Sequence, residues 1–206
     1  MKNYNQLLLD CVNQSHPRQI GRYYASEIYQ IIKGYLQPKN FFTSKPIDLT
    51  GAKNILRGEA YETQFKEVLE ANKIKFRYGD EIKREIQLTE EVVLVVKPDF
   101  EFEDFVIETK YPTTSITTIP EKWEYQLEAE YRATNKKVYL GIFSDPFNLT
   151  LYPFKPDERR WLKIQQNLLA FHEKLKQLAL ANFFDKDLDK NLDKDLKIKK
   201  KDKVKR

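Results

Sequence analysis

The side chains with the clearest chemical potential lie in an otherwise apolar stretch, residues 92–112 (VVLVVKPDFEFEDFVIETKYP). The stretch predicts two antiparallel strands joined by a two-residue turn at Glu103 and Asp104. With this turn, Asp99 lies directly opposite Glu108, and strand alternation places both carboxylates on one face of the hairpin. Directly opposed residues hold their Cβ atoms about 4.5–5.5 Å apart, where like charges repel. A divalent cation would offset the repulsion, since Mg²⁺ is held by one or two carboxylates and by substrate phosphates.

Lys110 follows Glu108 by two residues and therefore faces the same side of the hairpin. An ammonium group there would hold a water molecule beside the cation. The pattern also permits a plainer interpretation, in which these side chains are ordinary solvated charges at a hairpin edge. The tripeptide alone is weak evidence, because Glu81-Ile82-Lys83 repeats it without the accompanying aspartate motif.

The pair Pro98-Asp99, followed by Glu108-Thr109-Lys110, resembles the signature of the PD-(D/E)XK nuclease superfamily. The resemblance implies a restriction-endonuclease-like α/β core, in which a mixed central β-sheet is flanked by helices. It also implies that Asp99, Glu108 and the carbonyl of Thr109 hold one or two Mg²⁺ or Mn²⁺ ions. Lys110 would then orient the attacking water and neutralise charge that develops on the phosphate.

A helix expected at residues 51–72 carries a carboxylate on its apolar stripe. Glu62 falls on this stripe, where an unpaired carboxylate is expensive and usually finds a partner or a metal. The segment from Arg57 to Glu62 resembles a helix motif of the RecB-like branch of the superfamily. There, a glycine is followed four residues later by a metal-contacting His or Glu. We favour Glu62 over Glu59 as a metal ligand, because Glu59 lies off the stripe.

A third helix is expected from Pro120 to about residue 134, since proline is favoured in the first turn. The RecB-like branch carries a Q-x-x-x-Y motif on a helix in this place. Gln126 matches the glutamine, so the resemblance implies an active-site or substrate contact, although a polar residue at a helix–sheet boundary is the plainer interpretation. The tyrosine does not match: Glu130 occupies its position, and Tyr131 follows one residue later as a weaker candidate for nucleic-acid binding.

An amphipathic helix is expected within residues 15–37. Arg18, Arg22, Tyr23 and Tyr24 interleave basic and aromatic side chains just before its apolar stripe. Such a cluster can hold phosphates and stack bases of a single strand. The alternative is a helix edge whose tyrosines pack on the core.

Further strands are expected at residues 73–88, around a turn at Gly79, and at residues 138–143 and 149–154. Helices and strands that alternate in this order are typical of an α/β fold.

A long helix from Asp157 to about residue 183 has apolar residues at three- and four-residue steps: Trp161, Ile164, Leu168, Phe171, Leu175 and Leu178. This seam could close the core of its own domain or form a homodimer with a second copy. We expect His172, beside the seam, to be a surface or edge residue. We expect residues 1–184 to form one nuclease domain, with the core motifs in residues 50–135. The charged, low-complexity residues 185–206 should be a disordered tail or a phosphate-binding arm.

The chain has 206 residues and a formal net charge of +5. Its last ten residues hold seven of the 36 Lys and Arg residues and one of the 31 Asp and Glu residues, so the rest is close to neutral. Attraction for nucleic acid must therefore come from local patches or from the tail. No apolar run is long enough for a membrane span or a signal peptide, and we expect a cytoplasmic protein, in the host cytoplasm if viral.

The residues and the resemblance together predict a metal-dependent deoxyribonuclease that prefers single-stranded DNA and acts in replication, recombination or repair. The resemblance is closest to CRISPR-associated RecB-like exonucleases and to nucleases of archaeal viruses. The viral group fits better, because the only cysteine, Cys11, cannot supply the four that hold an iron–sulfur cluster in the CRISPR-associated enzymes. Two alternatives are a dimeric Holliday-junction resolvase and a non-catalytic DNA-binding protein with the same fold. The residues leave open whether cleavage is internal or from an end.

Overall fold

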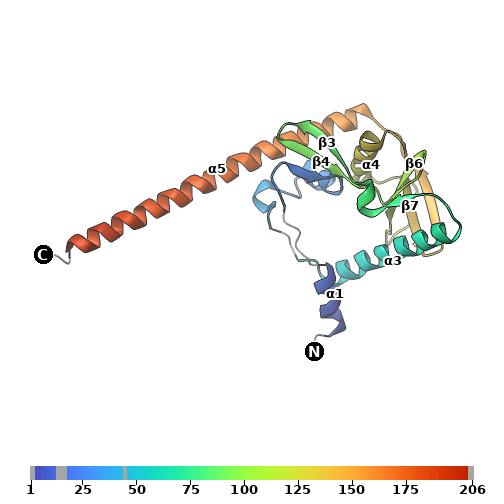
Figure 1. Cartoon of the computed structure of the whole chain (residues 1–206), viewed down its shortest axis with the longest axis horizontal. Coiled ribbons are helices and arrows are strands. Elements are labelled where there is room, and N and C mark those ends of the chain that lie inside the picture. The colour runs from blue at the N-terminus through green and yellow to red at the C-terminus, as the bar shows by residue number, and fades with distance from the viewer. Residues whose placement is uncertain (1–2, 13–17, 44–45, 204–206) are drawn as a thin grey trace.

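The structure is a computed structural model that describes residues 3–12, 18–43 and 46–203, with side chains described as far as residue 181. Figure 1 shows a body of strands and helices from which one long helix projects. The helices and strands are α1 (Tyr4–Val12), β1 (Arg22–Tyr24), η1 (Ala25–Glu27), α2 (Ile28–Ile32), η2 (Pro38–Asn40), α3 (Leu49–Ala71), β2 (Arg77–Tyr78), η3 (Gly79–Ile82), β3 (Arg84–Thr89), β4 (Val92–Val96), β5 (Phe100–Glu101), β6 (Phe105–Lys110), α4 (Glu121–Thr134), β7 (Lys137–Asp145), β8 (Asn148–Pro153) and α5 (Glu158–Lys203). Within the described part of the chain, no helix is both long and apolar enough to cross a membrane.

The strands form two sheets. One has the strand order β1-β4-β3, and the other has the order β2-β5-β6-β7-β8. Each sheet contains one parallel pair, β1 with β4 and β6 with β7, while the remaining pairs are antiparallel. The expected α/β class, with mixed sheets, flanking helices and a long C-terminal helix, is confirmed.

The stretch expected to form one strand before the Glu103-Asp104 turn is divided between the two sheets. β4 ends at Val96, and β5 begins at Phe100 in the other sheet. Pro98 lies in the break, where it removes a backbone donor and restricts the preceding residue. The division leaves Asp99 in the connection between the sheets.

The predicted register of the β5–β6 hairpin is confirmed. Phe100 pairs with Ile107, and Glu101 pairs with Val106. The turn is closed by the amide of Phe102, which donates to the carbonyl of Phe105 across 2.8 Å. Extending the same register places Asp99 opposite Glu108.

Helices cover both faces of the five-stranded sheet. Leu69 of α3 packs with Phe100 and Ile107 on one face. Leu127 of α4 packs with Val106 and strand β7 on the other face. Because side chains alternate along β6, Thr109 is directed toward α3, while Glu108 and Lys110 are directed toward α4.

Helix α5 fills the core of its own chain with the predicted seam. Trp161, Ile164, Leu168, Phe171 and Leu175 are buried against β4, α2 and α4. The seam therefore does not need a second chain to cover these five residues. Leu178, the next seam residue, is 40% exposed.

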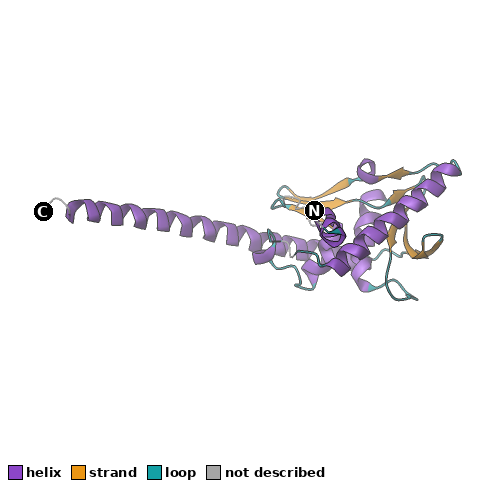
Figure 2. Cartoon of the chain, turned by 90° about the horizontal axis from the view of Figure 1, so that it is seen from below, coloured by secondary structure: helices purple, strands orange, loops and turns teal. Residues whose placement is uncertain are grey.

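Helix α5 continues to Lys203, beyond the body of the molecule (Figures 1 and 2). The expected tail from Asp185 is thus helical in its described part, and its last three residues lie outside the described residues. Residues 157–206 contain no Gly or Pro and are rich in Lys, Leu and Asp, so no strong helix breaker ends the helix earlier.

The expected N-terminal helix is much shorter than its apolar pattern predicts. α2 covers only Ile28–Ile32, while Arg22–Tyr24 forms a strand parallel to β4. The partners in this strand pair lie about 70 residues apart in the sequence, as Arg22 and Val93 illustrate. Local periodicity cannot reveal so distant a pairing.

Candidate functional site

Asp99, Thr109 and Glu62 meet where the two sheets join. The amide of Thr109 donates to Asp99 Oδ2 across 2.7 Å, and its hydroxyl lies 2.6 Å from the same oxygen. The same hydroxyl lies 3.1 Å from Glu62 Oε1. One hydroxyl hydrogen thus serves two carboxylates, so the residues expected as metal ligands from α3 and the hairpin are brought together.

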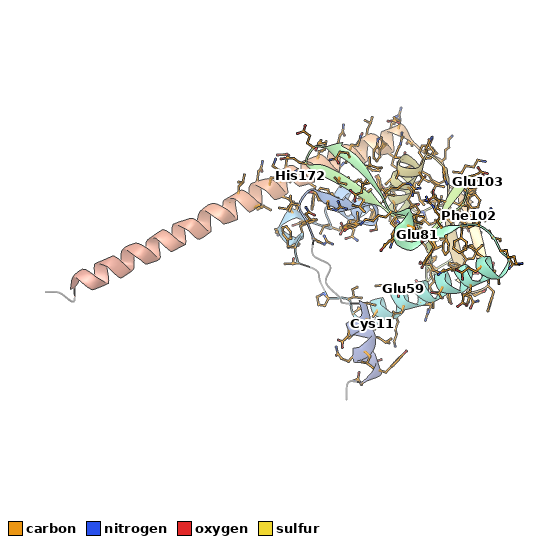
Figure 3. All side chains as sticks on the ribbon, in the orientation of Figure 1. Cys11, Glu59, Glu81, Phe102, Glu103 and His172 are labelled. Atoms are coloured by element: carbon orange, nitrogen blue, oxygen red, sulfur yellow. The ribbon has the colours of Figure 1, made fainter. Side chains whose placement is uncertain are left out.

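Helix α3 places Glu62 at this point. The helix begins at Leu49, and the Asp48 side chain caps it by accepting the amide hydrogen of Gly51 across 2.7 Å. Its Leu69 is buried on the sheet, which directs the half-buried Glu62 inward. Glu59, labelled in Figure 3, is exposed one turn earlier.

Glu108 and Lys110 form an ion pair on the α4 side of β6. Lys110 Nζ donates to Glu108 Oε1. Glu108 Oε2 is buried, and no described residue forms a hydrogen bond with it. A buried carboxylate oxygen without a donor is costly, and a hard cation is one species that satisfies it. The donor set of Glu62, Asp99 and Glu108 therefore fits Mg²⁺ or Mn²⁺.

The electrostatics of the site favour bound positive charge. Burial raises the pKa of Asp99 well above its usual value, and the charges of Glu108 and Glu62 raise it further. Burial also raises the pKa of Glu62, against the opposing effect of its Thr109 hydrogen bond. Burial lowers the pKa of Lys110, but the charges of Glu108 and Asp99 outweigh that effect and raise it overall, so the lysine stays cationic.

The carboxylate oxygens of Glu62, Asp99 and Glu108 are not all as close to one another as the ligands of a single bound ion. No choice of one oxygen from each of Glu62, Asp99 and Glu108 brings all three within 4.8 Å of one another, whereas Glu91, His172 and Glu173 bring one ligand atom each that close within the described part of the chain. A cation shared by the first three residues would have to draw them together.

The cluster at Glu91 is a poor competitor for the cation. Lys176 Nζ lies 2.7 Å from Glu91 Oε2, so an ammonium group already neutralises this carboxylate. His172, labelled in Figure 3, is only 4% exposed, and its Nδ1 lies 3.0 Å from the hydroxyl of Tyr23. The expectation that His172 is a surface or edge residue is therefore wrong: it packs under the β3–β4 turn.

Gln126 and Glu130 both lie on the buried side of α4. Gln126 is 9% exposed and Glu130 is fully buried. Glu130 interacts with Glu108, and both of its carboxyl oxygens lack a hydrogen-bond partner. Tyr131 is different, because it packs half-buried against the apolar cluster around Leu127. The structure thus brings Glu130, rather than Tyr131, to the acidic residues.

The basic and aromatic residues expected to bind nucleic acid lie in and before β1. Tyr23 is fully buried between Phe41 and Phe171, so the expectation that it stacks on a base is wrong. The physical reason is the parallel pairing with β4, which directs this ring into the core.

The neighbours of Tyr23 are more accessible. Tyr24 is 42% exposed. Arg22 pairs with Glu85 across 2.5 Å, and Arg18 pairs with Glu27 across 2.5 Å. These pairs neutralise the two arginines, and neither arginine forms a contact with Glu62, Asp99 or Glu108.

A different aromatic and basic cluster borders the acids and was not singled out from the sequence. The rings of Tyr61 and Tyr111 meet edge to face with centroids 4.8 Å apart, and the Arg57 guanidinium lies 5.4 Å from the Tyr111 centroid. Tyr61 precedes Glu62, and Tyr111 follows Lys110. The signal available in the sequence was that two separate acidic motifs each have an adjacent tyrosine.

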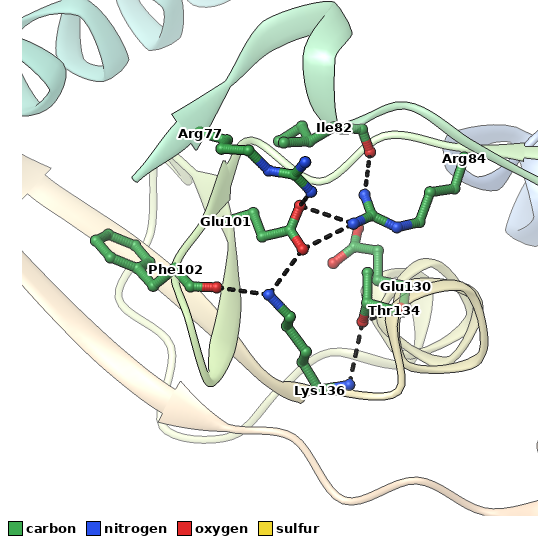
Figure 4. A network of polar contacts seen from close by, with 8 residues as sticks. All are labelled: Arg77, Ile82, Arg84, Glu101, Phe102, Glu130, Thr134 and Lys136. Carbon is green, nitrogen blue, oxygen red and sulfur yellow. Dashed lines mark hydrogen bonds and ion pairs between the residues drawn. The ribbon is translucent and has the colours of Figure 1, made fainter. Parts of the chain in front are cut away.

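The hairpin that carries the site is held by a buried ion cluster around Glu101 (Figure 4). Glu101 is 2% exposed and accepts from Arg77 at 2.5 Å, from Arg84 at 2.7 Å and from Lys136 at 2.9 Å. Burial alone would raise the pKa of Glu101, but hydrogen bonds from Lys136, Arg77 and Arg84 lower it to about 2. The cluster ties β5 to strands β2 and β3 and to the end of α4.

Similarity to known proteins lies in the fold. No protein-family description matches the chain, and no curated protein matches it in sequence. The crystal structure of SSO0001 superposes with a TM-score of 0.62 at 15% identity and covers 82% of this chain and 86% of its own. An alkaline exonuclease from Laribacter hongkongensis gives a TM-score of 0.56 at 12% identity, over 90% of this chain and 98% of its own. Its complex with dAMP gives 0.58 at 12% identity, over 83% of this chain and 95% of its own. The chain therefore has the fold found in a known exonuclease.

Proposed function

We propose that the protein is a metal-dependent deoxyribonuclease of the PD-(D/E)XK superfamily. The observation that carries the proposal is the joining of Asp99 to Thr109 at 2.7 Å and 2.6 Å, with Glu108 and Lys110 paired on the adjacent residues of β6. The fold shared with an alkaline exonuclease supports the same class of reaction. The positions of Glu62 and Gln126 support the RecB-like branch within it.

The cation would be held by Asp99, Glu108 and Glu62, with the Thr109 carbonyl as a further donor. When bound, Mg²⁺ or Mn²⁺ polarises the scissile phosphate and lowers the pKa of the attacking water. The protein's own contribution is to hold these carboxylates on three separate elements, so that their repulsion is relieved only when positive charge is present.

Lys110 would position the water and balance negative charge on the phosphate. Its ammonium group is kept protonated by Glu108 and Asp99. An ammonium ion is a donor, so Lys110 acts by orientation and electrostatics rather than as a general base.

Single-stranded DNA is the substrate that the surroundings of the site favour. Arg57 is exposed, and Tyr61 and Tyr111 are half-buried beside the acids. Aromatic rings beside a guanidinium suit unstacked bases and their phosphates, since base stacking tolerates any sequence. We propose that this cluster receives the strand next to the scissile phosphate.

The proposal is tested with purified protein, Mg²⁺ or Mn²⁺, and three substrates: end-labelled single strands, circular single strands and matched duplexes. We expect cleavage of single strands that EDTA abolishes. Circular strands separate internal cleavage from cleavage at ends, and a four-way junction tests the resolvase alternative. Glu108→Gln, purified in parallel, is the control for contaminating nucleases. Equal activity of this variant and the wild type would refute the assignment.

A further inference from the structure

Two glutamates of α4 are fully buried but have opposite surroundings. Glu128 accepts from Arg132 at 2.9 Å, from Arg160 at 3.1 Å and from the amide of Asp157 at 2.9 Å. Glu130, two residues later, has no hydrogen-bond partner for either carboxyl oxygen among the described residues. The fold thus supplies donors for one buried carboxylate and none for the other.

Glu101 makes the same contrast from the neighbouring strand. Arg77, Arg84 and Lys136 all reach its carboxylate. Glu130 is drawn in the same close-up, and no dashed line reaches its carboxyl group (Figure 4). Cations are therefore available in this region, yet among the described residues none forms a hydrogen bond or an ion pair with Glu130. Lys110, which pairs with Glu108, acts on Glu130 through its charge alone.

Glu130 is directed at Glu108 instead. The two carboxyl groups interact closely, and Glu108 Oε2 is the third buried carboxyl oxygen without a hydrogen-bond partner among the described residues at this point. Three orphaned carboxyl oxygens are thus gathered on the α4 side of β6. Burial of unpaired carboxylates in contact with each other is unfavourable unless positive charge compensates for their repulsion and lost hydration.

We propose that Glu130 is a further cation ligand and that it forms, with Glu108, a second divalent-cation position beside the one at Asp99. The inference rests on the proposed function. Glu108 links the two positions, because it precedes Thr109, which binds Asp99, and because it interacts with Glu130 on α4. Hydrolysis of phosphodiesters commonly uses two cations, one for the attacking oxygen and one for the leaving oxygen.

The test counts Mn²⁺ ions bound by the full chain without DNA, using isothermal titration calorimetry. We expect two Mn²⁺ per wild-type chain. Glu130→Gln keeps the size of the side chain but removes its charge, so it should bind one Mn²⁺, with binding at the second position weakened at least about 10-fold. Glu128→Gln is the matched control: it removes an equally buried carboxylate and should lower thermal stability while leaving two Mn²⁺ bound.

Asp99→Asn separates failure of this inference from failure of the proposed function. If the wild type binds one Mn²⁺ that is lost in Asp99→Asn and retained in Glu130→Gln, the second position is refuted while the nuclease site stands. If Asp99→Asn leaves Mn²⁺ binding unchanged, the proposed function itself is refuted.

Crystals of the wild type grown with Mn²⁺ decide the matter independently, should Glu130→Gln fail to fold. An anomalous peak within ligand distance of Glu130 would support the second position. A peak at Asp99 alone would overturn it.

Discussion

Asp99 and Thr109 are joined twice, because the amide and the hydroxyl of Thr109 reach the same oxygen, Asp99 Oδ2, across 2.7 Å and 2.6 Å. Asp99 belongs to the short connection between the two sheets and has no ladder bonds there of its own. Its position relative to Glu108 is therefore set by the residue that follows Glu108 on β6.

Asp99→Asn should lower cleavage of single-stranded DNA by more than about 100-fold, because it removes a direct metal ligand rather than a residue that supports a ligand through a hydrogen bond. In the absence of metal, Asp99→Asn should be more stable than the wild type at neutral pH. The raised pKa of Asp99 means that the native state favours the protonated form, so the wild type loses stability as the pH rises above the usual range of a carboxyl group. Thermal unfolding in EDTA at several pH values measures this. Full cleavage activity of Asp99→Asn would contradict the assignment. A metal-free variant that is less stable than the wild type would contradict it too.

Lys110→Ala should cut slowly while binding single-stranded DNA nearly as well as the wild type. Its removal leaves the buried carboxylate of Glu108 without the ammonium group that pairs with it, so metal-free stability should also fall, by about 3 kcal/mol. Single-turnover cleavage rates and DNA affinity measured in EDTA separate the two effects. A variant that cuts at the wild-type rate once bound would leave Lys110 without a catalytic role.

Glu62→Gln and Glu59→Gln form a matched pair one turn apart on α3. Glu62 is linked to Asp99 through Thr109, whereas Glu59 is exposed. Only Glu62→Gln should weaken Mn²⁺ binding and slow cleavage, by about 10- to 100-fold. Titration of activity against Mn²⁺ concentration provides the measurement. An equal effect of both substitutions would point to general surface charge instead of a ligand.

Tyr111→Ala should weaken binding of single-stranded DNA by about 1–3 kcal/mol, the usual contribution of one stacked base. Tyr35→Ala is the control, because Tyr35 is 71% exposed on the segment after α2 and lies outside the cluster of Arg57, Tyr61 and Tyr111. Fluorescence anisotropy in EDTA compares the two. Tyr24→Ala, measured alongside, tests whether the exposed tyrosine of β1 contributes as the sequence indicates.

Tyr23→Phe should change stability in a pH-dependent way and leave DNA affinity unaltered. Burial raises the pKa of Tyr23 to about 12 in the native protein. The unfolded state loses this proton at lower pH, so the stability contributed by the neutral phenol is present below about pH 10 and is lost as the pH rises to about 12. The loss amounts to about 3 kcal/mol, and Tyr23→Phe should abolish it. Denaturant unfolding between pH 9 and pH 12 is the measurement, and identical pH profiles would show that the phenol is not buried.

Short-range features of the fold and site followed from sequence patterns. The acidic pair Glu103-Asp104 predicted the turn, and the register from it matches the pairing of Phe100 with Ile107 and of Glu101 with Val106. The apolar stripe of α3 separated Glu62 from Glu59, because helical periodicity reports which face is covered. These inferences depend only on residues that are close in the sequence, either within a few helical turns or across one β-turn.

Long-range features did not follow. Tyr23 was misplaced because its strand pairs with β4, and the periodicity of its own neighbourhood indicates a helix. Glu130 was noted only as a departure from the Q-x-x-x-Y pattern. Glu128 has Arg132 four residues later, whereas Glu130 has Thr134 there. The rest of their difference depends on Arg160, about 30 positions later in the chain, which reaches Glu128.

Helix α5 has a consequence for synthesis of the chain on the ribosome. Trp161 through Leu175 complete the apolar core that supports β4, and they are made after every candidate ligand. A nascent chain that has emerged only as far as Glu130 has all its acids but lacks the support for β4 and for the connection that holds Asp99. Cleavage activity should therefore appear late in translation, and a prematurely terminated product that lacks α5 should be inactive.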